Sequence, residues 1–179
     1  MGIKGKYFIF PEENAEILTC LDALSDLPRL SHVDGLDEVH VYSCQPQNAF
    51  QKLMRKNSTQ ILNHQITEHS AQTVDIISKI PDGGSIKDLP REFWEVRKYN
   101  KAFERMSSQR PSNTVDTGHR NYFHFEENRI PTVRENARLQ SFPDDFEILG
   151  SKTSQYKQVG NAVPPLLAYA IAKAIREQL

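Results

Sequence analysis

Cysteine is scarce in this chain of 179 residues, which contains only Cys20 and Cys44. The two lie far apart and without Cys-x-x-Cys spacing, so neither a disulfide framework nor a zinc ribbon is indicated. Four of the six histidines occur in two pairs spaced by five residues rather than by the four of a helical zinc motif. We therefore interpret these histidines as solvated or hydrogen-bonding side chains and expect no metal site. The pairs are His64 with His69 and His119 with His124.

Net charge and long apolar runs are also lacking. Lys and Arg number 22 against 23 for Asp and Glu, giving a net charge of -1, whereas a DNA-binding module standing alone is usually more basic. The sequence contains no signal peptide and no apolar run long enough to cross a membrane. We expect a soluble, cytoplasmic protein with no membrane contact, of a length that suits one domain or one small domain with an appendage.

One segment that stands out is 131–146, PTVRENARLQSFPDDF. Thr132 followed three residues later by Glu135 is a capping-box pattern, which predicts a helix beginning at Val133. Pro143 cannot continue this helix, so it spans little more than two turns. Two arginines on so short a helix need acidic or phosphate partners, or carbonyls at a domain junction. The polar side chains expected to point away from the packed side are Arg134, Arg138 and Gln140.

A second segment is 156–165, YKQVGNAVPP. Gly160 and Asn161 precede a paired proline, which is tolerated at the start of a helix, and apolar residues then recur at helical spacing over 164–177. The start of this helix, after a flexible glycine, should offer free N–H groups and a positive dipole end to a small carboxylate or a hydroxyl-rich ligand. Its apolar side, 166–175, has to be covered, so the isolated chain is predicted to self-associate.

The order and spacing of these two segments resemble the ninth and tenth motifs of 5-cytosine DNA methyltransferases. In that family the Gly-Asn-Ala-Val turn lines the S-adenosylmethionine pocket, which implies cofactor contacts for Asn161, Ala162 and Val163. A surface turn capping an ordinary helix is the alternative. The ninth motif supports a domain hinge, and the resemblance gives this role to Arg134, Glu135, Arg138 and Gln140.

Two basic stretches are candidates for DNA contact. The pattern at 48–51 predicts a cap for a helix with a basic face, which is either a phosphate-contacting face or a solvated polar one. Basic and aromatic side chains are interleaved over 91–110, which suits a surface that binds nucleic acid. Trp94 and Phe103 are nevertheless assigned to a core. Strings in both stretches, AFQKLMR and PSNTV, also resemble the target-recognition region of the family. The residues predicted to face DNA are Lys52, Arg55, Lys56, Arg105 and Arg110.

The remaining patterns predict short elements. Strands are predicted at 6–10, 39–44 and 122–125, and capped helices are predicted after Thr19 and Ser70. The fold class expected is mixed α/β (α+β): a small target-recognition domain of short strands and helices, plus a C-terminal helix that belongs with a Rossmann-like catalytic domain. The predicted division is 1–38 (end of the catalytic domain and linker), 39–127 (target recognition), 128–153 (ninth-motif hinge) and 154–179 (tenth motif and C-terminal helix).

The front half of the family pattern is missing: there is no Pro-Cys loop, no Glu-Asn-Val segment and no glycine-rich turn for the cofactor. Family enzymes add a cysteine thiolate to the flipped cytosine, and neither Cys20 nor Cys44 matches that motif, so no catalytic residue is assigned. We expect a C-terminal fragment or subunit of a DNA (cytosine-5-)-methyltransferase that binds duplex DNA and is inactive without a complementary polypeptide carrying the cysteine. The alternatives are a DNA-binding module without catalysis and a protein-interaction module that retains the fold.

Overall fold

The structure is a computed structural model that describes residues 7–12, 16–30, 37–96, 103–117 and 122–179. His119 and the first residue of the strand predicted at 6–10 lie outside these ranges. The helices in the described part, in chain order, are α1 (Cys20–Leu24), α2 (Ala49–Met54), α3 (Ala71–Lys79), η1 (Ile86–Asp88), η2 (Arg91–Val96), α4 (Val133–Leu139), α5 (Lys152–Asn161) and α6 (Pro165–Gln178).

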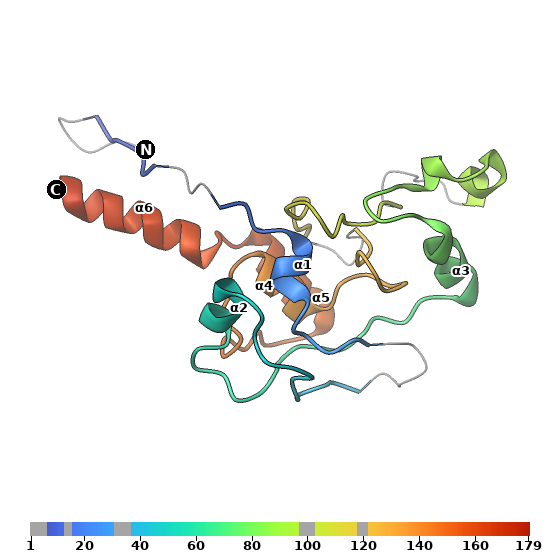
Figure 1. Cartoon of the computed structure of the whole chain (residues 1–179), viewed down its shortest axis with the longest axis horizontal. Helices are drawn as coiled ribbons and strands as arrows, with labels where there is room; N and C mark the ends of the chain where they lie inside the picture. The colour runs from blue at the N-terminus through green and yellow to red at the C-terminus, as the bar shows by residue number, and fades with distance from the viewer. Residues whose placement is uncertain (1–6, 13–15, 31–36, 97–102, 118–121) are drawn as a thin grey trace.

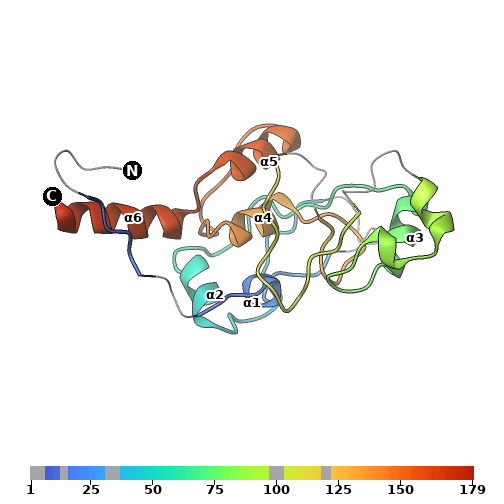
Figure 2. The same ribbon diagram turned by 90° about the horizontal axis from the view of Figure 1, so that it is seen from above.

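The helices are arranged along an elongated body (Figures 1 and 2). Helices α1, α2, α4 and α5 gather in the middle, and α3 lies toward one end. Helix α6 projects at the opposite end, with residues 7–10 beside it (Figures 1 and 2). The middle group is held together by α4, which packs against both α1 and α5.

Local capping signals account for where most of the short helices begin. The predicted capping box of α4 is confirmed, because the Thr132 hydroxyl accepts from the Glu135 N–H and the Glu135 carboxylate accepts from the Thr132 N–H. The caps predicted for the earlier helices are also confirmed, since each side chain accepts from a first-turn N–H. The capping residues of α1, α2 and α3 are Thr19, Asn48 and Ser70.

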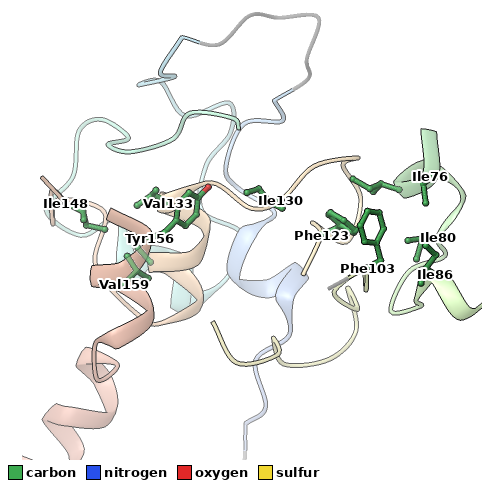
Figure 3. Packing of buried hydrophobic residues seen from close by; sticks show 12 residues of the cluster. Ile76, Ile80, Ile86, Phe103, Phe123, Ile130, Val133, Ile148, Tyr156 and Val159 are labelled. Carbon is green, nitrogen blue, oxygen red and sulfur yellow. The ribbon is translucent and has the colours of Figure 1, made fainter. Parts of the chain in front are cut away.

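A hydrophobic cluster connects the middle of the molecule with the α3 end (Figure 3). Val133, Tyr156 and Val159 pack between α4 and α5, while Phe103 and Phe123 meet the isoleucines of α3 and η1. The two phenylalanine rings contact edge to face, with centroids 5.1 Å apart. The prediction of a core role is confirmed for Phe103, which is buried. It is also confirmed for Trp94, which packs against the cluster and donates its indole N–H to the Leu89 carbonyl at 2.9 Å.

A second cluster ties α1 to the later parts of the chain. It is formed by Cys20, Ala23, Leu24, Leu27, Ile61, Met106 and Phe125. Backbone hydrogen bonds from Cys20 to the Arg110 carbonyl (2.9 Å) and from Leu21 to the Ser108 carbonyl (3.1 Å) fix α1 against the 103–117 segment. Residues 20–27, which lie within the segment 1–38 predicted as the end of the catalytic domain and linker, therefore pack against the 103–117 segment.

The three predicted strands do not form ladders in the described part of the chain. Residues 7–10 and 39–44 are extended or bent without strand pairing, and Phe123 makes only an isolated bridge with Arg105. Segment 39–44 meets 61–64 at two points, through the Val39 N–H to the His64 carbonyl and the Ile61 N–H to the His40 carbonyl. An apolar or alternating run becomes a strand only where a partner supplies a ladder, and these segments find at most one or two rungs.

Helix α5 is absent from the sequence-based prediction, which placed Gly160 and Asn161 in a flexible turn. Both residues instead end α5, and Gly160 is needed for close packing rather than for flexibility. A Cβ atom at Gly160 would lie 2.5 Å from the Asp116 carbonyl oxygen, so the helix approaches that backbone more closely than any side chain allows. The Tyr156 hydroxyl donates to the Pro131 carbonyl at 2.7 Å and anchors α5 beside the start of α4.

Helix α6 confirms the predicted C-terminal helix almost to the residue but makes few contacts. Of its residues only Ala174 is buried, and Leu166, Leu167 and Tyr169 are exposed. Among the residues that the structure describes, no helix combines the length and the apolar content that crossing a membrane requires.

Candidate functional site

Arg138 on α4 is the centre of a buried ion-pair network. Its guanidinium donates to Asp144 at 2.6 and 2.5 Å and to Asp26 at 2.8 Å, and none of the three side chains is exposed. Burial disfavours the charged form, but the two carboxylates outweigh it and raise the pKa of Arg138. The predicted acidic partners are therefore present. The predicted outward orientation is wrong, because Asp26 comes from a segment 112 residues away and encloses the side chain.

Arg134 is also fully buried, which corrects its predicted outward orientation. It donates to backbone carbonyls of Leu62 (2.7 Å), Pro143 (3.1 Å) and Phe146 (2.6 Å). One guanidinium therefore ties α4 to the loop before α5 and to the segment after α2. Gln140, at the end of α4, is half-buried and donates to the Val159 carbonyl of α5 at 2.7 Å. The side chains predicted to form a hinge thus join α4 to three separate segments.

Glu135 belongs to a second buried network with Arg129. The Arg129 guanidinium binds both carboxylate oxygens of Glu135, at 2.7 and 2.8 Å, and contacts Glu127 at 3.1 Å. Burial alone raises the pKa of Glu135, but the charge and hydrogen bonds of Arg129 outweigh this effect and lower it. Burial lowers the pKa of the neighbouring His124 to about 4, so this imidazole is neutral at pH 7.

The only candidate metal group in the described ranges is His124 with Glu127 and Glu135. Both carboxylates already bind Arg129, and the His124 Nδ1 accepts from the N–H groups of Glu126 and Glu127, each at 3.1 Å. The negative charge that would attract a cation is compensated by the guanidinium. We therefore assign these residues to a structural network and not to a metal centre.

Two of the arginines predicted to face DNA have structural roles. Arg105 is buried, and its five N–H groups donate to four backbone carbonyls and to the Asn128 side chain at 2.6–3.1 Å. Arg55 binds Asp26 at 3.1 Å and the Cys44 carbonyl at 2.8 Å, and its guanidinium lies 3.6 Å from the centre of the Tyr42 ring. Neither orientation is readable from a charge pattern, because the partners come from distant segments.

The other predicted DNA-facing residues are exposed. Lys52 and Lys56 lie on the outer side of α2 and just after it, and Arg110 lies at the rim of a surface cavity of about 300 Å³. The cavity is formed where the Gly83 turn approaches segment 104–113. Gly83 has a φ of +68°, which the tight turn requires. The remaining residues that line this cavity are Glu104, Arg105, Ser107, Pro111, Ser112 and Asn113.

The turn predicted to contact the cofactor lies at the surface between α5 and α6. Asn161 and Val163 are exposed, the latter by 61%, and Ala162 is half-buried with its N–H bonded to the Val159 carbonyl. The expected set of free donors at the start of α6 is smaller than predicted. Pro165 has no N–H, and the Leu166 N–H donates to the Ser141 hydroxyl at 3.2 Å. The turn offers one side-chain amide beside an apolar surface, which fits one wall of a binding site.

The cysteines are not arranged as nucleophiles. Cys20 has no exposed surface, and burial raises the pKa of its thiol to about 11. Cys44 is half-buried, and its sulfur lies 3.8 Å from the Asp26 carbonyl. A reactive cysteine needs an accessible thiol with a lowered pKa.

Four residues of these networks escaped the sequence-based prediction: Asp26, Tyr42, Arg129 and Asp144. The buried His64 bridges the Thr132 hydroxyl and the Pro28 carbonyl, each at 3.0 Å. The one local signal for the group is the Phe-Pro-Asp string that contains Asp144.

Comparison of the sequence with known proteins identifies its family. A model described as C-5 cytosine-specific DNA methylase matches residues 8–177. The type II methyltransferase M1.HphI of Haemophilus parahaemolyticus is 46% identical over 126 residues, which cover 70% of this chain and 34% of the relative. M.DdeI of Desulfomicrobium norvegicum is 36% identical over 180 residues, covering 90% of this chain and 43% of the relative. The chain thus spans less than half the length of either protein.

A shorter relative and a solved structure agree. M.AquIB of Picosynechococcus sp. is 39% identical over 131 residues, and the match covers 66% of this chain and 90% of that protein. A crystal structure assigned to a DNA modification methyltransferase of an E. coli prophage superimposes with a TM-score of 0.70 at 21% identity. That match covers 94% of this chain and 49% of the other, so the chain has the fold of part of a methyltransferase. From the family match across residues 8–177, the chain belongs to the C-5 cytosine-specific DNA methylases.

Proposed function

We propose that this chain provides target recognition and one wall of the S-adenosylmethionine pocket in a DNA (cytosine-5-)-methyltransferase. The cysteine nucleophile would come from a complementary polypeptide, and the chain would be inactive alone. The observation that carries this proposal is the state of Cys20, which is buried with a pKa of about 11, in a chain whose family depends on an accessible thiolate. M.AquIB supports it as a methyltransferase relative of which this chain covers 90%.

The DNA-contacting surface proposed here consists of Lys52 and Lys56 on the α2 side and Arg110 at the cavity rim. These cations are exposed, whereas the guanidinium groups of Arg55 and Arg105 are held by the protein itself. Arg110 stands beside Ser112 and Asn113, whose side chains can exchange hydrogen bonds with base edges or phosphates. The recognition region within the predicted division, 39–127, contains all three cations.

The cofactor wall proposed here is the turn Asn161, Ala162 and Val163. Its amide side chain and its exposed valine suit the polar and apolar parts of S-adenosylmethionine, and the partner would supply the rest of the pocket. We assign a positioning role to α4. Arg134 and Arg138 connect α4 with the segments after α2 and α1, Glu135 holds the start of α4 against Arg129, and the half-buried Gln140 connects the end of α4 with the helix that carries this turn.

The experiment is reconstitution with the parts of M1.HphI and M.DdeI that lie outside their matches to this chain, here called the M1.HphI and M.DdeI remainders. Each remainder is co-expressed with the chain, and transfer of labelled methyl groups from S-adenosylmethionine to duplex DNA is measured. Activity that requires both polypeptides supports the proposal. If both mixtures bind DNA in a salt-sensitive way but neither transfers methyl groups, the non-catalytic DNA-binding alternative is preferred.

The contribution of the DNA surface is tested in the active mixture with Arg110→Gln and the control Arg29→Gln, whose side chain is paired with Glu126 at the surface. If Arg110 contacts a phosphate, its loss reduces the slope of log K against log salt by about 1, and the control leaves the slope unchanged. Equal slopes for both variants would remove Arg110 from the proposed surface.

A further inference from the structure

The exposed apolar residues of the two chain ends gather at one end of the molecule. Residues 7–10 approach α6, and both lie away from the hydrophobic clusters (Figures 1 and 2). Tyr7 is 98% exposed and Ile9 72% exposed, and Leu167 and Tyr169 of α6 are also exposed. Single exposed apolar residues are common, but a group of this kind marks an interaction surface.

The backbone of Ile9 is held in a way that a neighbouring strand could reproduce. Its N–H donates to the Gln178 Oε1 at 2.9 Å, and its carbonyl accepts from the Gln178 Nε2 at 2.8 Å. Two residues of an antiparallel ladder exchange the same pair of hydrogen bonds. One side-chain amide near the C-terminal end of α6 therefore makes the pair of hydrogen bonds that a neighbouring strand would make.

The sequence of this segment fits a strand that is covered on both faces. Tyr7, Phe8, Ile9 and Phe10 are successive apolar residues without polar alternation, and Pro11 ends the run. Such continuous runs are typical of strands inside α/β sheets, which have helices on both sides. Within the described part of the chain, the segment has only the ring contact between Phe8 and Phe10, at 5.0 Å, and the Gln178 amide as specific contacts.

We propose that residues 7–10 insert as a strand into the β-sheet of the complementary polypeptide. The inference rests on the proposed function, because that function requires such a partner. The relatives contain the material for it: this chain covers 34% and 43% of two of them and 49% of the solved structure.

A second copy of this chain is a poorer occupant. Two copies meeting through residues 7–10 would form a two-stranded pair of four residues, and isolated two-stranded pairs are marginal in water. A partner sheet offers several strands and helices on both faces. The self-association predicted from the sequence would appear in the test below as protection of residues 8–10 in a dimer of the chain alone.

The test is hydrogen exchange at the amides of residues 8–10, measured for the chain alone and for its purified complexes with the M1.HphI and M.DdeI remainders. We expect exchange at Ile9 and its neighbours to slow by at least about 100-fold in the complex, because ladder amides are protected by the stability of the sheet. Unchanged exchange in an intact complex would overturn the proposal. So would failure of both remainders to form a complex, and so would equal protection in a dimer of the chain alone.

Two variants separate the backbone contribution from the side chain. Ile9→Pro removes the N–H and should weaken the complex at least about tenfold, whereas Ile9→Val keeps the N–H and should stay within about threefold. Gln178→Leu removes the side-chain amide that bonds the Ile9 backbone and should not weaken the complex. Unchanged Trp94 fluorescence verifies that each variant is folded. A protected, intact complex without methyl transfer would contradict the proposed function and leave the strand insertion standing, whereas methyl transfer without protection would do the reverse.

Discussion

Replacing Arg138 with methionine tests the claim that α4 is held by buried charge. The guanidinium makes short hydrogen bonds to Asp144 and Asp26, and its side chain has no exposed surface. Removing one partner of a buried ion pair costs about 3–5 kcal/mol, because the other charge stays buried. Asp26 retains Arg55 and Asp144 retains the Tyr42 hydroxyl, so the expected loss lies at the lower end, about 3 kcal/mol.

The assay is urea denaturation followed by the fluorescence of Trp94, the only tryptophan. For a chain of this length, a loss of about 3 kcal/mol corresponds to a decrease in Tm of about 6–12 °C. The matched control is Arg29→Met, which breaks the ion pair between Arg29 and Glu126. The Arg29 side chain is 75% exposed and the Glu126 side chain 45% exposed. Exposed pairs contribute about 0.2–1 kcal/mol. If Arg138→Met costs no more than this control, the network does not stabilise the fold and the reasoning is wrong.

Three further predictions concern stability and reactivity. Gly160→Ala should destabilise the chain by about 1–3 kcal/mol in the same urea assay, because the added Cβ meets the Asp116 carbonyl; an unchanged free energy of unfolding would contradict the close approach. Cys20 should resist iodoacetamide at pH 8 until the chain unfolds, as measured by mass spectrometry, since its thiol is buried with a pKa of about 11; rapid native labelling would disagree. His124, whose folded pKa is about 4, contributes stability above its unfolded pKa of about 6.5, and this contribution is lost as the pH falls toward 4. We expect the free energy of unfolding to fall by about 2 kcal/mol between pH 7.5 and 5, and to fall less in His124→Gln. Glu127 partly offsets this loss, because burial raises the pKa of its carboxyl group.

Features encoded over a few residues were predictable from the sequence. The capping box of Thr132 and Glu135 predicts the start of α4, and the paired prolines predict the start of α6. Helix α5 was missed because its sequence, KTSQYKQVGN, has little apolar periodicity, although Ser151 is a capping signal.

Features that depend on distant segments were not predictable. Arg134 and Arg138 have polar side chains on a short helix, which favours an outward orientation until the carbonyls and carboxylates that surround them are known. Arg105 was predicted to contact DNA because it lies in a stretch of basic and aromatic residues. In the fold its guanidinium is buried and bonds backbone carbonyls such as that of Ile77. The absence of strand pairing at 7–10 also depends on distant segments, because a strand forms only where a neighbouring strand is available to pair with it.

We propose that the 161–163 turn completes a cofactor pocket whose other walls lie on another polypeptide. Calorimetric titration of S-adenosylmethionine into the chain, into the M1.HphI remainder and into their complex tests it most directly. The account predicts no measurable binding to the chain alone, binding to the complex at least about tenfold tighter than to the remainder, and loss of this gain in Asn161→Ala. Equal dissociation constants for the remainder and the complex would contradict it.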